Sequence, residues 1–560
     1  MNQQTQKIIS FVVKLSGKNF FYLAILSLVF DANAAKAQAE WVKQLGGLEG
    51  DVGVCSAADG FGHVFTIGTF SGTSSFGNYN ISSLGRGDVF VIRSNASTGD
   101  IDWVRQIGGN SEDYGNAIGS DPFGNIYCTG RFSGTVLFGT FSLTATGTAD
   151  AFVAKIDPTV GAVLWAKKMG GSGFDGGFAI TSDGLGNIYT TGCYQGTGIF
   201  GTFTLNPVGS NLNVFVQRID ATSGSVVWAK GYGSAGYSSA TSISCDGSGD
   251  VYLTGYFEGE TSFGTNTLTA VQYQDVFVSK HYASTGNVVW AFSSGGLGND
   301  SGYGIVAGTD GFVYTTGKFE NDWVVGTSTL TSQGSADIFL SRRDALTGSI
   351  SWVKRFGSQG YDQPNAITRD ENGHLFITGQ FNGYISFGSA VLASMGNADV
   401  FIVKIDMLTG NALMSSSMGG QAVDSGNGIT SGPNNALYCT GSFQSGANIG
   451  GEILTAKGTA DIFIMKLNGT NVGLNESMQL LNSIQLIPVP FEDELRITVG
   501  KPNLSAYQLS ISDASGKLML QLESKQTQQN LKLNFLEAGI YFVTIVEETG
   551  AKAVKKIIKK

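Results

Sequence analysis

The chain has 560 residues, of which 42% are hydrophobic and only 14% are charged, and it contains 80 glycines. Together with 11% aromatic residues, this composition is typical of many short strands joined by tight turns, so we expect an all-β protein. The net charge of −10 is scattered along the chain, which excludes the basic footprint that nucleic acids or anionic lipids need; the one basic cluster is the C-terminal "KKIIKK".

The N-terminal segment has the organisation of an export signal. Lys7, Lys14 and Lys18 precede the apolar run "FFYLAILSLVF", and the small residues that follow it suit cleavage by signal peptidase. A membrane anchor is the alternative, but these eleven apolar residues are fewer than the roughly 20 that cross a bilayer. We predict a signal peptide over 1–39 and a mature chain without a transmembrane anchor.

Two series of residues recur with a period of 62 or 63 residues. The first series consists of tryptophans: Trp41, Trp103, Trp165, Trp228, Trp290 and Trp352, with Met414 at the next step. In the second series Phe follows two residues later and Arg or Lys five residues later: Asp88, Asp150, Asn213, Asp275, Asp337, Asp399 and Asp461. Seven copies therefore lie between residues 40 and 470, and repeats of this kind are typical of a solenoid or a propeller.

One period contains signals for four strands. They are "YGNAIGSD", "GNIYCTGRF", "DAFVAKID" and "AVLWAKKM", and an additional segment, "VLFGTFSLTATG", lies between the second and the third. The mature chain would begin on a fourth-type strand, "EWVKQLGG", and the seventh copy ends on a third-type strand, "DIFIMKLNG". Pairing these two strands would remove both bare edges, so we predict a closed, seven-bladed β-propeller over 40–470.

The repeat resembles that of the secreted β-propeller repeat proteins, with a pattern similar to "D.F..K......G...W...GG" followed by "I..D..GN.Y.TG.F.G...FG". This resemblance covers the repeat region, and it implies a fold rather than an activity.

Beyond residue 470 the period stops. After a polar linker over 471–483, alternating strands around "DASGK" predict a small, immunoglobulin-like β-sandwich over 484–560. The motifs "PVPF", "DASGK" and "LEAGIYFV" and the terminal lysines resemble the C-terminal sorting domain of type IX secretion in Bacteroidetes, although Val489 replaces the Asn expected between the prolines. The resemblance implies the type IX machinery as a partner and delivery to the outer-membrane surface or the medium; an accessory immunoglobulin-like domain is the alternative.

The five cysteines do not form a disulfide pattern. Cys128 and Cys439 occupy the same "YCTG" position in different copies, and Cys55, Cys193 and Cys245 lie in apolar strand-like runs. We predict free, buried thiols.

Six carboxylates follow the fourth strands of the repeat: Asp51, Asp113, Asp175, Asp300, Asp362 and Asp424, with Ser238 in the remaining copy. The loops that carry them lead to the innermost strands, so these residues would surround one mouth of a central channel. They could hold a cation or a polar ligand. The alternative is that each carboxylate accepts hydrogen bonds from its own turn, which repetition in nearly every copy favours.

Other repeated residues predict structure rather than chemistry. The Asp-x-Phe carboxylates and the basic series (Arg93, Lys155, Arg218, Lys280, Arg342, Lys404 and Lys466) should tie adjacent blades together. Turns such as "DPFGN" supply one carboxylate each, which is too few for calcium. His63, His281 and His374 suggest neither a metal site nor a catalytic triad. The "TGNVVW" runs resemble the tryptophan motif of quinoprotein propellers, but we expect those tryptophans to join blades and predict no cofactor.

Deviations from the repeat are the better candidates for a binding site. Trp323 replaces smaller residues such as Thr261 and Ile385, and it is either a partly exposed platform for a ligand or a residue packed under its loop. The variable residue of "TG-x-F" is a second candidate: Thr69, Arg131, Cys193, Tyr256, Lys318, Gln380 and Ser442.

No acid, base, nucleophile or metal set stands out, so we favour a secreted or cell-surface binding or adhesion module without catalytic activity. Its ligand would be an extracellular glycan or protein. The alternative is a polysaccharide-active hydrolase or lyase, because a glycosidase needs only two carboxylates and repeated Asp residues could hide such a pair.

Overall fold

The computed structural model describes residues 39–388, 390–469, 484–499, 506–514, 516–547 and 552–560. The predicted signal peptide, apart from Ala39, and the predicted linker lie outside the described residues. The described part of the chain contains strands and one short 3-10 helix, η1 (Pro433–Asn435), so it offers no helix that could span a bilayer.

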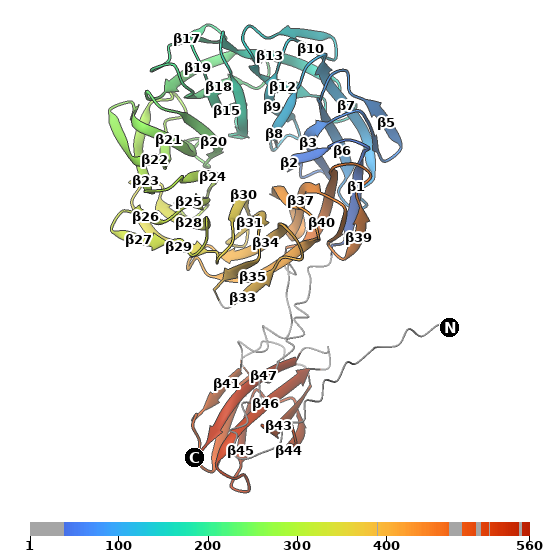
Figure 1. Ribbon diagram of the computed structural model, residues 1–560, viewed down its shortest axis with the longest axis vertical. Helices are drawn as coiled ribbons and strands as arrows, with labels where there is room; N and C mark the ends of the chain where they lie inside the picture. Colours follow the sequence, from blue (N-terminus) through green and yellow to red (C-terminus); the bar gives the residue numbers. More distant parts are fainter. Residues whose placement is uncertain (1–38, 389, 470–483, 500–505, 515, 548–551) are drawn as a thin grey trace, which may run out of the picture. The chain divides into compact units, whose positions relative to one another are not determined.

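Four-stranded antiparallel sheets surround a central axis, as Figure 1 shows. The innermost strands are β2 (Val52–Ala58), β8 (Tyr114–Ser120), β14 (Gly176–Ser182), β20 (Ser238–Cys245), β24 (Ser301–Ala307), β30 (Asp362–Arg369) and β36 (Ser425–Ser431). Each of them contacts the next, and β36 contacts β2, which completes the ring. The predicted all-β propeller class is therefore confirmed.

The other three strands of each unit follow outward in the order of the sequence. The second strands are β3 (His63–Phe70), β9 (Ile126–Phe132), β15 (Asn187–Tyr194), β21 (Val251–Phe263), β25 (Phe312–Phe319), β31 (His374–Phe381) and β37 (Ala436–Phe443). The third strands are β6 (Asp88–Asn95), β12 (Asp150–Ile156), β18 (Asn213–Asp220), β22 (Asn266–His281), β28 (Asp337–Asp344), β34 (Asp399–Asp406) and β40 (Asp461–Asn468). The fourth strands are β7 (Ile101–Gly109), β13 (Val163–Gly171), β19 (Val226–Tyr232), β23 (Val288–Gly296), β29 (Ile350–Phe356), β35 (Ala412–Gly420) and β1 (Trp41–Gly47).

The first strand of the described chain closes the ring. β1 pairs with β40 from Trp41 opposite Lys466 to Leu45 opposite Ile462, and it thereby becomes the fourth strand of the last unit. The closure predicted from the sequence is confirmed. Both chain segments lose an edge that would otherwise be free to pair with another molecule.

A hairpin between the second and third strands of each unit lies against the preceding unit. These hairpins are β4 (Thr73–Phe76) with β5 (Tyr79–Ser82), β10 (Thr135–Phe138) with β11 (Phe141–Thr144), β16 (Gly198–Phe200) with β17 (Phe203–Leu205), β26 (Asp322–Val325) with β27 (Ser328–Thr331), β32 (Tyr384–Phe387) with β33 (Ala390–Ala393), and β38 (Gly446–Ile449) with β39 (Glu452–Thr455); in the fourth unit β21 and β22 continue into the hairpin. For example, β10 pairs with the end of β7. Glycine is needed there, because a Cβ atom on Gly109 would lie 2.2 Å from the carbonyl oxygen of Thr135.

The core lies between neighbouring sheets, so strands are covered on both faces. In β12, Ala151, Phe152, Val153 and Ala154 are all fully buried, which explains why apolar residues are not confined to alternate positions. Tryptophans of the fourth strands join the units: the indole N–H of Trp103 donates to the carbonyl of Pro158 in the next unit. Equivalent bonds link Trp41 to Ala96, Trp228 to Ala283, Trp290 to Ala345 and Trp352 to Leu408.

The tail forms two antiparallel sheets with a common apolar core. One contains β41 (Ile484–Ile487), β42 (Glu494–Val499) and β45 (Gln528–Lys532), and the other contains β43 (Tyr507–Asp513), β44 (Leu518–Ser524), β46 (Gly539–Glu547) and β47 (Lys552–Lys559). Leu495, Ile497, Leu509, Ile511 and Ile545 are fully buried in that core. The immunoglobulin-like classification of this part stays a prediction.

The cysteines are free, as predicted. Cys128, Cys193 and Cys439 are buried, whereas Cys55 and Cys245 keep some exposure.

Candidate functional site

The six predicted channel carboxylates are buried rather than open to a ligand. Asp51 and its five equivalents have no exposed surface. One oxygen of the Asp51 carboxylate accepts a hydrogen bond from the amide of Gly47 at 2.7 Å, and the other accepts from the amide of Ser71 and the hydroxyl of Ser74. The same pattern recurs at Asp113, Asp175 and Asp424. These groups hold the loop and the adjacent hairpin, as the turn alternative predicts.

Burial changes the acidity of these carboxyls. Desolvation raises the pKa of Asp113 and Asp175 to about 6, and that of Asp300 and Asp362 to about 7, against the usual 3.8. Hydrogen bonds from backbone amides counteract part of that effect. The buried ring of carboxyls is therefore sensitive to pH near neutrality, although no ligand can reach it.

Trp323 is buried, so the prediction of a partly exposed platform is wrong and the packing alternative holds. Its side chain is 1% exposed and stacks on Phe339, with ring centroids 4.5 Å apart. In other units the contact is made by a Phe two positions after the residue equivalent to Trp323. Phe263, for example, packs against Phe277 with ring centroids 4.7 Å apart. Residue 325 is Val in this unit. Trp323 therefore supplies the ring that Val325 lacks, and the paired exchange was visible in the sequence.

Five members of the basic series tie neighbouring units together, as predicted, whereas Arg342 bonds Asp310 and Tyr314 of its own unit. Arg93, Lys155, Arg218, Lys280 and Lys404 each donate to a backbone carbonyl 65 or 66 residues further along the chain. The prediction that the Asp-x-Phe carboxylates also tie neighbouring units together is wrong.

Those carboxylates bond within their own units. Asp88 accepts from the amide of Leu84 at the end of its hairpin and from the side-chain amide of Gln106 on its own fourth strand. Asp150 pairs likewise with Lys168, at 3.1 Å. Each carboxylate thus holds its hairpin and outer strand together, because the hairpin folds back toward the third strand.

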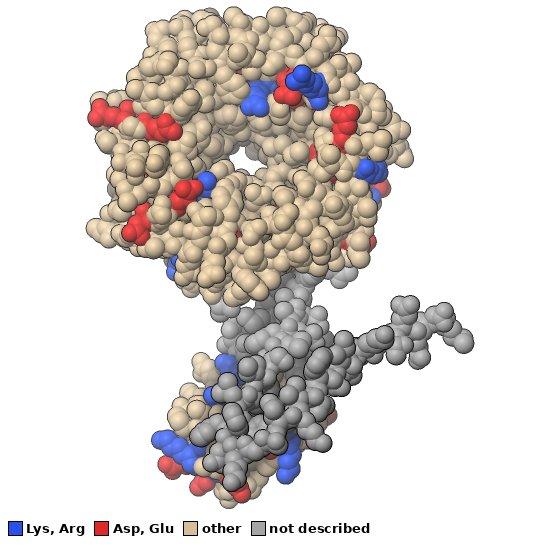
Figure 2. Space-filling view, viewed as in Figure 1, with Lys and Arg blue, Asp and Glu red and all other residues tan. Residues whose placement is uncertain are grey.

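The two ends of the channel differ in what surrounds them. We call the end at which the innermost strands begin the loop mouth, and the end at which they finish the turn mouth. The seven variable "TG-x-F" residues pair with the first residues of the innermost strands, as Arg131 pairs with Tyr114, so they all ring the loop mouth. In the view of Figure 2, the centre of the ring is open and charged side chains are few and of both signs.

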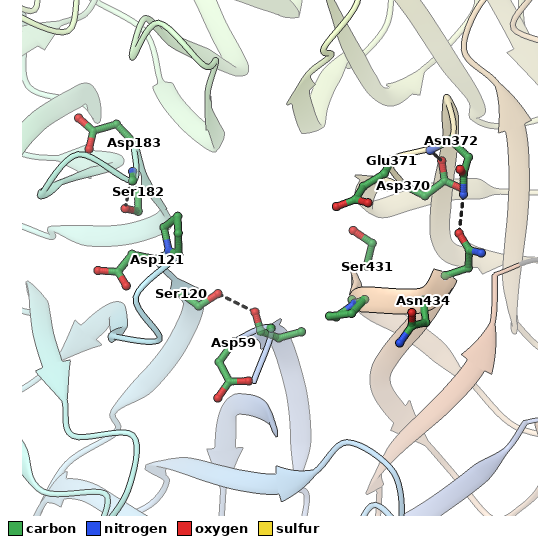
Figure 3. A pocket seen from close by; sticks show the side chains of 17 residues that line it. Asp59, Ser120, Asp121, Ser182, Asp183, Asp370, Glu371, Asn372, Ser431 and Asn434 are labelled. Carbon is green, nitrogen blue, oxygen red and sulfur yellow. Dashed lines mark hydrogen bonds between the residues drawn. The ribbon is translucent and has the colours of Figure 1, made fainter. Parts of the chain in front are cut away.

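A cavity of 790 Å³ lies at the turn mouth. It is lined by the turns at 58–60, 120–122, 182–184, 370–372 and 431–435, which come from five units. Its side chains include five carboxylates and no Lys or Arg, and Figure 3 shows hydroxyl, amide and carboxylate groups on opposite sides of the opening. A second cavity of 360 Å³ shares Ala58, Gly60, Pro433 and Asn434 with the first, so the hollow extends toward Lys466.

Most carboxylates of the turn mouth already have partners. One oxygen of Asp121 accepts from the amides of Phe123 and Asn125, and the other accepts from the side chains of Asn125 and Tyr127. Asp183 repeats these bonds. The exposed Glu371, by contrast, has no hydrogen bond among the described residues.

The turns of this mouth carry exposed apolar side chains on three consecutive units, next to the residues that line the cavity. Phe61, Phe123 and Leu185 occupy the same turn position and are 65%, 72% and 74% exposed. The corresponding position of the sixth unit is the polar Asn372. The ring of Phe61 lies over Gly124 of the next turn, where a Cβ atom would be 3.1 Å from it. Sequence reasoning missed this rim, although the repeat pattern places all three residues in phase.

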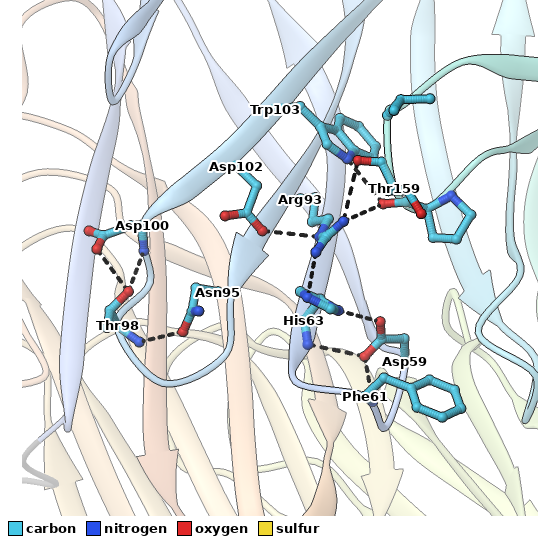
Figure 4. Close-up of polar contacts among 12 residues, drawn as sticks. Asp59, Phe61, His63, Arg93, Asn95, Thr98, Asp100, Asp102, Trp103 and Thr159 are labelled. Atoms are coloured by element: carbon cyan, nitrogen blue, oxygen red, sulfur yellow. Dashed lines mark hydrogen bonds and ion pairs between the residues drawn. The ribbon is translucent and has the colours of Figure 1, made fainter.

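His63, at the turn mouth, is not arranged as a catalytic base. His63 Nδ1 lies 2.8 Å from Asp59, and its Nε2 lies 2.5 Å from the guanidinium of Arg93, which also pairs with Asp102 (Figure 4). Because a guanidinium only donates, Nε2 of His63 is the acceptor and its lone pair is unavailable to activate a nucleophile. Within the described ranges, no three His, Cys, Asp or Glu side chains lie together as metal ligands would.

Family comparisons match two parts of the chain. Residues 485–560 match the family described as secretion system C-terminal sorting domain, and residues 102–131 match the family described as beta-propeller repeat. No curated protein matches the chain. The chain thus carries a propeller repeat and a type IX sorting tail, and such a tail implies export to the cell surface or the extracellular space.

Solved structures resemble the chain only distantly. The quinohemoprotein alcohol dehydrogenase of Comamonas testosteroni is 11% identical, with 78% of each chain covered and a TM-score of 0.39. The acylaminoacyl peptidase of Pyrococcus horikoshii is 10% identical, with 81% of this chain and 59% of that chain covered and a TM-score of 0.36. PorZ, a surface component of the type IX secretion system of Porphyromonas gingivalis, is 13% identical, covers 92% and 75%, and has a TM-score of 0.21. Scores this low carry no argument about activity.

Proposed function

We propose that this exported propeller is a non-catalytic binding or adhesion module that holds a hydroxyl-rich glycan at the turn mouth. The observation that carries the proposal is the 790 Å³ polar cavity, whose lining turns also carry the exposed Phe61, Phe123 and Leu185. Exposed aromatic rings beside hydroxyl, amide and carboxylate groups suit a sugar, whose C–H face stacks on a ring while its hydroxyls form hydrogen bonds.

Binding rather than hydrolysis is favoured by the state of the carboxylates. A glycosidase needs one carboxylic acid that donates a proton and a second carboxylate that acts as nucleophile or base. Asp121 and Asp183 instead accept amide, side-chain and tyrosine donors at both oxygens, which fixes them as structural acceptors. Glu371 is the free carboxylate of the cavity, and a single group does not form such a pair.

A glycan array followed by affinity measurements on the full chain tests the proposal. Phe61→Ala combined with Phe123→Ala should weaken binding of the best glycan by about tenfold or more, the scale of losing aromatic anchors. Leu346→Ala is the matched control, because Leu346 is 76% exposed in a turn between third and fourth strands. Equal binding by wild type and the double variant would contradict the proposal, and release of reducing sugar by the wild type would support a hydrolase instead.

A further inference from the structure

Arg131 lies at the loop mouth, at the far end of a strand from the turn cavity. It pairs with Tyr114 at the start of β8, whereas Ser120, at the end of β8, lines the turn cavity. A strand of seven residues separates these two points by about 20 Å. Whatever binds near Arg131 is therefore independent of the turn mouth.

Two aromatic rings hold the guanidinium of Arg131. Its Cζ atom lies 4.1 Å from the centroid of Tyr114 and 5.2 Å from that of Phe174, which belongs to the following unit. The hydroxyl of Tyr114 donates to Glu112 at 3.1 Å, which fixes the first ring. Stacking on rings orients the plane of a guanidinium but uses none of its N–H donors.

Those donors have no partner among the described residues, although the side chain is partly buried. Seven other arginines of the ring differ in this respect, whereas the exposed Arg86 also has no side-chain partner among the described residues. Side-chain hydrogen bonds or ion pairs are made by Arg93, Arg105, Arg218, Arg342, Arg343, Arg355 and Arg369. Arg131 thus presents an oriented donor edge that the protein leaves free, and the planar fork of a guanidinium matches a carboxylate with two parallel hydrogen bonds.

Space for the rest of a ligand lies beside Tyr114. A cavity of 280 Å³ is lined by Tyr114, Asn116 and Thr69 and by two charged residues, Arg86 and Glu112, a volume of about nine waters. The hydroxyl of Thr69 is buried and has no hydrogen-bond partner.

We propose that the loop mouth binds a carboxylate-bearing glycan: Arg131 takes the carboxylate of a uronate unit, and the cavity beside Tyr114 takes hydroxyls of the chain. The polar lining suits a hydroxylated ring, because the amide of Asn116 donates to Gly177 and leaves its side-chain oxygen to accept from a sugar hydroxyl. Arg86 adds a positive charge at the same cavity, and Glu112, whose carboxylate accepts from Tyr114, adds a negative one.

Binding of oligogalacturonate to the full-length protein, compared with its fully methyl-esterified form, tests the proposal. We expect the acid to bind and the neutral ester to bind at least about tenfold more weakly, the scale of charge-assisted hydrogen bonds. Arg131→Gln should reduce affinity for the acid by a similar factor. Arg131→Lys should lose part of the affinity, because an ammonium cannot form the paired bonds.

Lys318→Gln is the matched control, since Lys318 holds the equivalent position in another unit but pairs with Glu320 at 3.5 Å. It should leave binding unchanged, as should the Phe61 and Phe123 substitutions at the turn mouth. An unaltered melting temperature verifies that each variant is folded. Equal binding of acid and ester, an unaffected Arg131→Gln variant, or equal binding of polyglutamate that depends on Arg131 would overturn the proposal; the last result would assign a peptide carboxylate.

Discussion

Replacing Trp323 with Ala should destabilise the ring by about 3–5 kcal/mol, the cost of removing a fully buried large aromatic side chain. The indole is 1% exposed and lies 4.5 Å from the ring of Phe339 and 5.7 Å from that of Phe319, measured between centroids. Its neighbour Val325 is too small to fill the cavity that the substitution leaves.

A compensating change should recover part of that loss. Thr261 and Phe263 fill the equivalent places of the fourth unit, and Phe263 lies 4.7 Å from Phe277. The double variant Trp323→Thr with Val325→Phe copies this arrangement. It should be more stable than Trp323→Thr alone by about 1 kcal/mol or more, because coupling energies of 0.5–3 kcal/mol are usual for side chains in contact.

Urea unfolding followed by far-ultraviolet circular dichroism measures both effects. Tyr384→Ala is the control: Tyr384 is 64% exposed in another hairpin, and its loss should change stability by less than about 0.5 kcal/mol. The reasoning fails if Trp323→Ala costs less than about 1 kcal/mol, or if Val325→Phe adds to the cost of Trp323→Thr.

Three further predictions concern closure, pH and export. Deleting residues 41–47 removes the partner of β40, so the variant should aggregate or melt well below the wild type; unchanged melting would contradict closure by β1. Burial raises the pKa of Asp300 and Asp362 to about 7, so folding takes up protons: their contribution to stability is complete below about pH 4 and is lost as the pH rises through 7. The melting temperature should therefore fall from pH 5 to pH 8, although His281, whose pKa burial lowers to about 4, opposes this at the acid end; a rise across that range would refute it. Truncation of 484–560 should prevent delivery to the surface, and surface display of the truncated chain would argue against the sorting tail.

The repeat could be predicted from the sequence because its markers act locally. Trp41 and Asp461 stand at known positions within a period, so the missing fourth strand of the last unit and the strand that supplies it were both identifiable. Turn glycines and strand-forming residues required no knowledge of neighbouring units.

Side-chain exposure could not be predicted in the same way, because it depends on segments distant in the sequence that fold over a residue. Asp51 is enclosed by Ser71 and Ser74, some 20 residues further on, and Trp323 is covered by the third strand of its own unit. The free guanidinium of Arg131 depends likewise on Phe174 across a seam between units. Position within a period indicates which loop a residue occupies but not what folds over it.

The pairing of β1 with β40 also determines the order of events when a chain folds. Side chains of the two strands meet across 417 residues, as Gln44 and Asp461 do, whereas neighbouring units meet across about one period of 62. The entropic free-energy cost of closing the longer loop is higher by about 1.7 kcal/mol, so we expect this contact to form last. We therefore expect β1 to stay unpaired until β40 has formed, so that the β1–β40 seam is the last part of the ring to assemble.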